Sequence, residues 1–457
     1  MTYSSILFIF CFLPLSLLIC AAVPERHRNK AIFLESTLFC ASFGLRYMCF
    51  MLGYVLVNYT CGRLIGKLRQ VGKRGALPFA VGVMTDFFAL LTARSHLFEG
   101  LREKLPGYVF PIGISLFSLS ALGYLIDVFR GKISPERHII RFSLYLMMFQ
   151  RLIMGPIVSY RTFKRISKQR KLSLENIGQG MTIFVVGPAK KVLLADNLLV
   201  LYRAVWSVDA AKLSVVTAWL GVFSYVLCLY FTVSGFSDMG AGAALCFGYR
   251  FPSAFRYPLF SSSLSRFGGR WHIQAVGWFR RYITRPISMT TRKIWLRRVL
   301  YTAVWGLTVY WYGFSTGSLI AGLLFGSFRL VEHYLLPHKL LKATGIIYTF
   351  LGIMLCAVFL SANSVTTGAG VLWAMIGGTR LIADSLTFYL LRSYIVVLLI
   401  AMYASTDLFR NALTRAARSK LSGLIYAAKP PAVLLLLALC TAFIAYSGSS
   451  GEMILTL

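Results

Sequence analysis

The sequence predicts an all-α integral membrane protein, and three features support that fold class. Apolar residues make up 57% of the 457 residues and charged residues only 14%, whereas a soluble domain carries about 25% charged residues. The mean hydropathy is +0.69. Apolar runs near the roughly 20 residues that cross a bilayer recur along the whole chain. We therefore expect one polytopic helical bundle over residues 1–457, with about ten to thirteen helices and no β-domain.

The expected helices follow the apolar runs in chain order. Gly, Pro or charged residues interrupt several runs, and these pieces are expected to be re-entrant or to line a cavity, where protein satisfies the backbone. The first run has basic residues behind it and none ahead of it, which predicts an uncleaved membrane helix with its C-terminal end toward the cytoplasm. The runs are 4–23, 31–60, 76–93, 108–129, 140–160, 181–203, 213–234, 237–252, 297–313, 315–335, 344–362, 366–376, 383–403 and 430–447.

The balance of charge is strongly basic. Forty-eight Lys and Arg face fifteen Asp and Glu, a net charge of +33. Basic short loops are typical of the positive-inside rule and of anionic lipid surfaces, so membrane lipid is an expected partner. Recognition of an anionic lipid-linked or acidic polymer substrate is the alternative. Nucleic acid is not expected, because no soluble basic domain is visible. The basic loops are 26–30, 62–75, 161–171 and 280–298.

Residues 252–296 form the one long segment of weak hydrophobicity. Their aromatic and basic mixture predicts an interfacial helix at the headgroup level, with Trp271, Trp278 and Trp295 as anchors. A polar segment between membrane spans is also where a polytopic membrane enzyme places an active site.

His272 is the best candidate for chemistry within this segment. Arg270 precedes it and Arg280 follows closely, and nearby positive charge is expected to keep the imidazole neutral, as a base or hydrogen-bond partner requires. The other reading is structural, because a lone histidine is more often structural than catalytic.

Six acidic residues in apolar runs are further candidates, since an ionisable residue inside a membrane is costly. The alternative is that each pairs with a nearby Lys or Arg, which we favour for Asp127 with Arg130 and for Asp196 with Lys190 or Lys191. The nine cysteines have no metal-site spacing, so neither a metal site nor a disulfide framework is expected. The six acidic residues are Glu35, Asp86, Asp127, Asp196, Asp238 and Glu332.

Five blocks of the sequence stand in a specific order and spacing, although each block alone is a weak signal. They are "FPIGISLFSLSALGYLIDVFRGKI" at 110–133, "LIMGPIVSY" at 152–160, "KKVLLADNL" at 190–198, "YFTVSGFSDMGAGAALCFGYRFPSAFRYPL" from Tyr230, and "RWHIQAVGWFR" from Arg270. Together they resemble the membrane-bound O-acyltransferase family, in the bacterial branch that includes the membrane proteins of alginate O-acetylation and teichoic-acid D-alanylation.

The resemblance implies a helical bundle with a funnel through a bacterial cytoplasmic membrane. No bound cofactor is implied; an acyl donor such as acetyl-CoA or an acyl carrier protein would be the co-substrate on the cytoplasmic side. The acceptor would be a hydroxyl of a cell-surface polysaccharide, and a periplasmic or extracellular acyltransferase is a candidate partner. Residues expected to bind substrate or line the funnel are Ser234, Asp238, Arg270, Trp271, Arg280 and Trp311.

Two histidines matter in that family, and the chain matches one of them. His272 lies in the arginine-tryptophan-histidine motif. The other, the catalytic base, is expected between a Trp and a Gly, where this chain has Tyr312 between Trp311 and Gly313. A further histidine position holds Phe325. Other departures from the family pattern are Thr232, Arg266, Gly268, Gly269 and Arg281.

These departures leave three functions open. Acyl transfer to a hydroxyl needs a base within hydrogen-bond reach, and a tyrosine, with a pKa near 10, would donate a hydrogen bond at pH 7 instead. The chain is then an active O-acyltransferase with His272 as base and Tyr312 as helper, a catalytically inactive homologue that binds a partner or acyl donor, or a transporter that uses the funnel.

Overall fold

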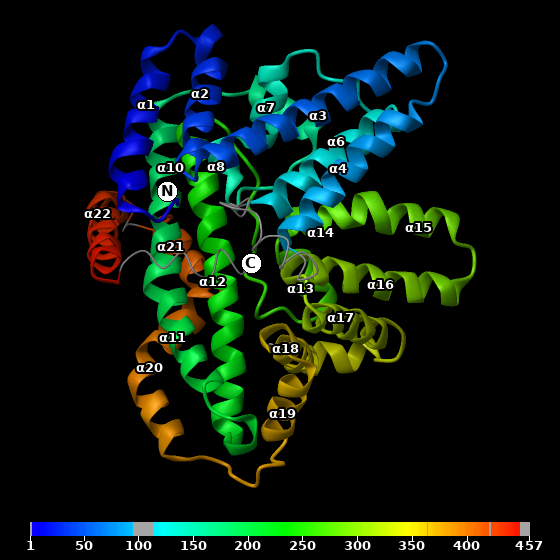
Figure 1. The fold of residues 1–457 in the computed structure, drawn as a ribbon. Helices are drawn as coiled ribbons and strands as arrows, with labels where there is room; N and C mark the ends of the chain where they lie inside the picture. The colour runs from blue at the N-terminus through cyan, green and yellow to red at the C-terminus, as the bar shows by residue number, and fades with distance from the viewer. Residues whose placement is uncertain (1, 95–112, 363, 420–421, 448–457) are drawn as a thin grey trace. The chain divides into compact units, whose positions relative to one another are not determined.

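The computed structural model of the chain describes residues 2–94, 113–362, 364–419 and 422–447. Every regular element in these ranges is helical (Figure 1), which confirms the predicted all-α class. Among them, six helices are long and apolar enough to cross a membrane, so the protein is a multi-pass membrane protein. These spans are Leu45–Gln70, Ala76–Ala93, Val215–Cys246, Ala343–Ser361, Ser385–Ala404 and Ser422–Tyr446.

The chain divides into two compact units. The first comprises Met1–Gly187, Phe236–Ser253 and Ile444–Leu455, and the second comprises Pro188–Gly235, Ala254–Phe443 and the last two residues. Helix α12 (Val215–Cys246) therefore contributes residues to both units. The single membrane domain over residues 1–457 stays a prediction.

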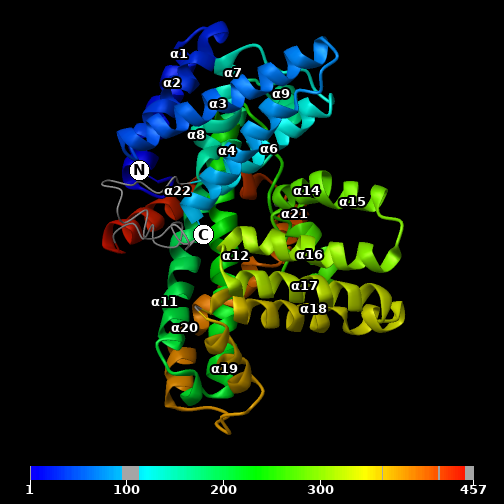
Figure 2. The ribbon, with the colours of Figure 1, turned by 45° about the vertical axis from the view of Figure 1, so that its right-hand side comes forward.

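In the first unit, α3 (Leu45–Gln70), α4 (Ala76–Arg94) and α6 (Ile114–Phe129) pack against one another (Figure 2). Aromatic rings fill its core, with Phe8 lying 5.7 Å from Phe39 between ring centroids. The other helices of this unit are a π-helix at Phe8–Phe12, α1 (Leu13–Ala22), a 3-10 turn at Glu25–His27, α2 (Arg28–Ala41), α7 (Ile139–Met147), α8 (Phe149–Leu152), α9 (Tyr160–Lys168) and α10 (Leu174–Pro188).

In the second unit, α16 (Ile294–Gly313), α17 (Thr316–Tyr334) and α18 (His338–Ser361) lie side by side (Figures 1 and 2). Small residues allow close approach: a Cβ placed on Gly322 would lie 2.6 Å from the carbonyl oxygen of Trp305. The unit also holds a π-helix at Ala189–Ala195, α11 (Asp196–Trp206), a 3-10 turn at Ala210–Lys212, α13 (Leu264–Arg270), α14 (Ile273–Phe279), a π-helix at Arg280–Thr284, α15 (Arg285–Thr290), α19 (Val365–Met375), α20 (Ser385–Ala404), α21 (Leu408–Ala416) and α22 (Ser422–Ser447), whose last turn is counted with the first unit.

Several predicted segments begin and end elsewhere. The run 31–60 divides into α2 and α3 at Gly44, whose φ of 120° favours glycine. The runs 213–234 and 237–252 instead join in α12. Gly242 in this helix lets the backbone at Phe184 come close, since a Cβ there would lie 2.4 Å from the Phe184 nitrogen. Part of the run 108–129 lies outside the described residues.

The acidic residues of the apolar runs differ in the partners that they contact. Lys191 forms an ion pair with Asp196, which confirms that prediction. Asp86 accepts a hydrogen bond from Asn58 at 2.8 Å and has no Lys or Arg partner within the described ranges, so the alternative of an ion pair does not apply to it there. Glu35 is buried, and neither of its carboxylate oxygens has a hydrogen-bond partner among the residues that the structure places.

Candidate functional site

The candidate site is built around the turn between α13 and α14 in the second unit. The predicted interfacial helix over 252–296 is instead a series of short helices, and His272 at the break has a φ of 38°. A positive φ is uncommon for a residue with a side chain and recurs at functional sites. Two backbone hydrogen bonds fix the turn, from Ile273 N to Ala254 O at 2.8 Å and from Arg256 N to Arg270 O at 3.1 Å.

The imidazole of His272 is enclosed by aromatic rings. It is stacked on Phe255, with centroids 5.8 Å apart and planes 4° from parallel, and on Trp311 at 6.2 Å and 29°. The residue is 4% exposed, and this burial lowers the pKa of His272 to about 4. The side chain is therefore neutral at pH 7, as predicted, but burial is the cause, and Arg270 and Arg280 are exposed.

Trp311 reaches this site from the last turn of α16. It is buried, and its ring also lies 6.2 Å from that of Phe279. The stretch that follows makes a sharp helix–helix turn: Phe314 has a φ of 49°, and Ser315 and Ser318 exchange hydrogen bonds that cap α17. The backbone of Tyr312 belongs to α16, while its side chain lies outside the described residues.

Trp271 is half-buried and packs against other rings of the second unit. Its ring contacts Phe255 and Phe267 at centroid distances of 5.4 Å, and Tyr230 of α12 at 6.1 Å. Ser234, one turn along α12 from Tyr230, is buried, and its Oγ has no hydrogen-bond partner in the described part of the chain.

An apolar cavity of about 100 Å³ adjoins the indole of Trp271. Phe325, which is buried, forms part of its wall and contacts Trp305 at 4.8 Å and Phe267 at 5.8 Å between ring centroids. Trp305 lies over Gly268, where a Cβ would be only 2.8 Å from its ring. The cavity suits an apolar group, because its walls are mostly aliphatic and aromatic.

Glu332 on α17 holds the start of α13 in place. Its carboxylate accepts hydrogen bonds from Leu264 N at 2.6 Å and Ser265 N at 3.3 Å, so it satisfies backbone donors that a helix N-terminus leaves open. It acts as a helix cap, whereas the sequence left a functional role and an ion pair open for it. The side chain thereby positions the helix that leads directly into Trp271 and His272.

The structure brings together three of the predicted site residues, Trp271, His272 and Trp311, and places Ser234 on the α12 face that meets them. Asp238 belongs to the first unit and is half-buried there. Sequence reasoning missed Phe255, which stacks on His272, and Trp305. Phe255 lies inside the block "FPSAFRYPL", and that position was the available signal.

Comparison of the chain with known proteins identifies its family. A model of the MBOAT, membrane-bound O-acyltransferase, family matches residues 9–339, more than half of the chain. A probable alginate O-acetylase AlgI from Pseudomonas fluorescens is 30% identical over 339 residues, which is 73% of this chain but only 66% of that protein, just under two thirds of its length.

Two further relatives extend the match. The probable alginate O-acetylase AlgI of Azotobacter vinelandii is 28% identical over 92% of this chain and 88% of its own length. A peptidoglycan O-acetyltransferase of Helicobacter pylori is 26% identical over 82% of this chain and 80% of its own length. The chain belongs to the membrane-bound O-acyltransferase family.

Proposed function

We propose that the protein transfers an acetyl or other acyl group to a hydroxyl of a cell-surface polysaccharide across a bacterial cytoplasmic membrane. The observation that carries this proposal is the buried, neutral imidazole of His272 between Phe255 and Trp311. Relatives described as alginate O-acetylases and as a peptidoglycan O-acetyltransferase support acylation of a glycan.

In the proposed reaction, His272 is the base that takes the proton of the acceptor hydroxyl. The acceptor oxygen forms a bond to the carbonyl carbon of a thioester donor, acetyl-CoA or an acyl carrier protein, while the imidazole takes the hydroxyl proton. The carbon–sulfur bond then breaks, and the thiol leaves with that proton. The neutral form needed for the first step is the form that burial favours.

The surroundings give the other site residues proposed roles. Trp311 holds the imidazole by stacking, and we place Tyr312 at the family's catalytic-histidine position, as a hydrogen-bond donor to the developing oxyanion. The apolar cavity beside Trp271 would hold the acyl group. Ser234, Asp238, Arg270 and Arg280 remain proposed funnel-lining or substrate-binding residues.

Two of the proposed departures from the family pattern adjoin the same side chain. Gly268 leaves room for the Trp305 ring, and that ring contacts Phe325. This shared neighbour supports a linked change at these two positions. A periplasmic or extracellular acyltransferase partner fits either an active or an inactive form of such a site.

One observation favours a second candidate function, a catalytically inactive homologue that binds an acyl donor or a partner subunit. A general base is most effective when its pKa lies near the working pH, and burial lowers the pKa of His272 to about 4. An imidazole of this kind accepts hydrogen bonds well but holds a proton weakly.

The deciding experiment measures acyl transfer by the purified chain in lipid, with labelled acetyl donors and candidate glycans. Turnover that disappears in His272→Gln and persists in His333→Gln, an exposed histidine of α17, supports the enzyme. Turnover that requires Tyr312→His supports the inactive homologue. Movement of unmodified glycan across a vesicle, without acylation, would contradict both.

A further inference from the structure

A second, strongly basic pocket lies in the first unit, where the C-terminal end of α3 meets the loop that follows α6. Its volume is about 460 Å³, and four of its lining side chains are cationic. No acidic residue is among the described residues that line it. We call the four cationic residues the basic cradle: Arg63, Lys67, Arg69 and Arg137.

Arg69 fixes one wall of the basic cradle. Its Nη1 donates hydrogen bonds to the carbonyl oxygens of Val128 and Phe129, at 3.1 and 3.0 Å, and so caps the end of α6. Gly131 turns the chain there with a φ of 70°, and a Cβ on it would lie 2.2 Å from the Arg69 guanidinium. The loop is therefore held tightly against α3.

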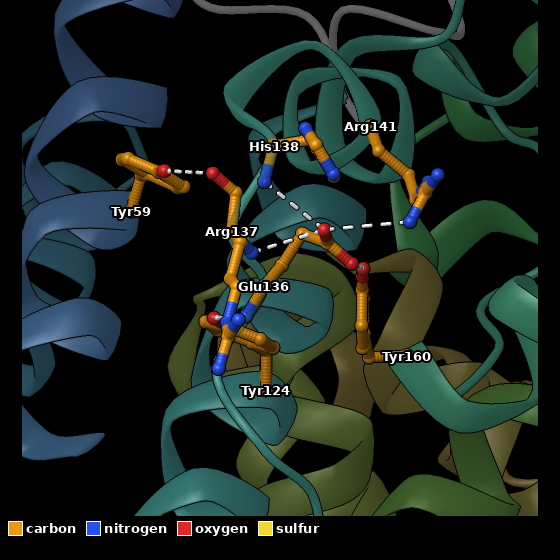
Figure 3. Close-up of polar contacts among 7 residues, drawn as sticks. All are labelled: Tyr59, Tyr124, Glu136, Arg137, His138, Arg141 and Tyr160. Atoms are coloured by element: carbon orange, nitrogen blue, oxygen red, sulfur yellow. Dashed lines mark hydrogen bonds and ion pairs between the residues drawn. The ribbon is translucent and has the colours of Figure 1, made fainter.

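Glu136 holds the backbone at Arg137, which lines the pocket (Figure 3). Its Oε1 accepts hydrogen bonds from the backbone N–H groups of Arg137 and His138, each at 3.0 Å, and Tyr160 donates to its Oε2. Tyr59 of α3 donates to the Arg137 carbonyl oxygen at 2.7 Å. The position of Arg137 beside α3 is thus set by its backbone contacts on both sides.

The same contacts occupy the Glu136 carboxylate, so it does not pair with the cationic side chains of the basic cradle. Burial would raise its pKa, but the Tyr160 hydroxyl, the His138 N–H and the Arg141 guanidinium at 3.5 Å together hold the pKa of Glu136 below its usual value. Glu136 stays ionised at neutral pH and is satisfied by these neighbours. Glu136 therefore does not offset the positive charge of the basic cradle, which can attract an anion from outside the protein.

The outer face of α3 indicates which anion fits. Along this candidate membrane span, exposed positions recur every three or four residues and form one stripe. Leu56 is 51% exposed and Leu64 49%, with Lys67 of the cradle on the same stripe; Val71, directly after the end of α3, is 68% exposed. Apolar side chains that a bilayer would cover therefore lead along the helix to the basic cradle.

We propose that the basic cradle binds the phosphate headgroup of an anionic membrane phospholipid whose acyl chains lie along the exposed stripe of α3. Guanidinium groups pair with phosphate oxygens through two parallel hydrogen bonds, and Lys67 adds a point charge. Clusters of Lys and Arg at the end of a membrane helix are suited to anionic headgroups. A free phosphate would bind the basic cradle but would make no contact with the exposed apolar stripe of α3.

The test measures lipid binding by the full chain, using native mass spectrometry from detergent with phosphatidylglycerol, phosphatidylcholine or inorganic phosphate added. The variant is Arg63→Gln/Lys67→Gln/Arg137→Gln, which spares Arg69 because it caps α6. The matched control, Lys164→Gln/Arg165→Gln/Lys168→Gln, removes the same charge from exposed positions of α9. Thermal unfolding of each variant shows whether it is folded, and Arg137→Gln alone serves if the triple variant is not.

We expect phosphatidylglycerol to bind the wild type and the α9 control more tightly than phosphatidylcholine. The cradle variant should lose at least about tenfold in affinity for phosphatidylglycerol. Equal losses in the cradle and α9 variants would overturn the proposal in favour of diffuse charge attraction. Inorganic phosphate that displaces phosphatidylglycerol at equal concentration would overturn the lipid assignment in favour of a soluble phosphate.

Discussion

The imidazole of His272 and the indole of Trp311 lie against each other, with ring centroids 6.2 Å apart and planes inclined by 29°. The two residues come from separate helical segments of the second unit, and the contact joins the Arg-Trp-His turn to the end of α16. The position of Tyr312 is thereby tied to His272 through its direct neighbour in sequence.

Replacing Trp311 should uncover His272. Trp311→Ala removes a ring that stacks on the imidazole, and we expect a loss of about 3–5 kcal/mol in unfolding free energy, as for other buried Trp→Ala changes. Modification of His272 by diethyl pyrocarbonate, followed by mass spectrometry, should become faster in this variant than in the wild type. His333, which is exposed, should react equally in both, and an unchanged His272 rate would contradict the contact.

The stability of the second unit should depend on the protonation of His272. Its folded pKa of about 4 lies below the usual value near 6.5, so protons bind the unfolded chain more tightly. The contribution is fully present above about pH 6.5 and is lost as the pH falls toward 4, about 3 kcal/mol in all. Thermal unfolding of His272→Gln should lack this part of the pH dependence, and an identical slope in wild type and variant would refute it.

Glu332 should stabilise the protein by capping the start of α13. Glu332→Ala leaves the N–H groups of Leu264 and Ser265 without their carboxylate, and we expect about 1–2 kcal/mol of destabilisation. Glu332→Gln keeps one oxygen as an acceptor and should lose less. Diethyl pyrocarbonate reactivity of His272 supplies a second readout, because a displaced α13 would move the adjoining turn. A loss of stability with unchanged His272 reactivity would show that the cap does not position the site.

The sequence predicted the helical class and identified His272 as a candidate site residue, because hydropathy and the order of the motif blocks are local properties. It did not predict the aromatic enclosure, since Phe255, Trp271 and Trp311 meet only after the chain folds. Trp271 was expected at a membrane surface because an amphipathic indole suits that environment as well as a packed interior.

Other errors also came from tertiary contacts. The runs 213–234 and 237–252 were expected as separate segments, but they form the single helix α12, in which Gly242 packs closely against the backbone of Phe184. Glu332 carried no signal of capping, because the donors that it satisfies lie about 67 residues away in sequence. The basic segment 62–75 was predicted to be a loop, but its residues up to Gln70 belong to α3. The pocket around Arg63 and Arg137 was not predicted, because it depends on a second loop folding against this helix.

The contact between α16 and α17 should tolerate no added methyl group at Gly322. A Cβ there would lie 2.6 Å from the Trp305 carbonyl oxygen and 2.8 Å from the Gly306 Cα, so the backbones would have to separate. We expect Gly322→Ala to destabilise the protein by about 1–3 kcal/mol in thermal or denaturant unfolding. Gly277→Ala on α14 is the matched control, because no atom lies within 4 Å of its added Cβ and alanine favours a helix by about 1 kcal/mol. Since Trp305 contacts Phe325 beside the apolar cavity, Gly322→Ala should also reduce binding of apolar probes there. Equal stability of the two variants would show that the helices can separate without loss.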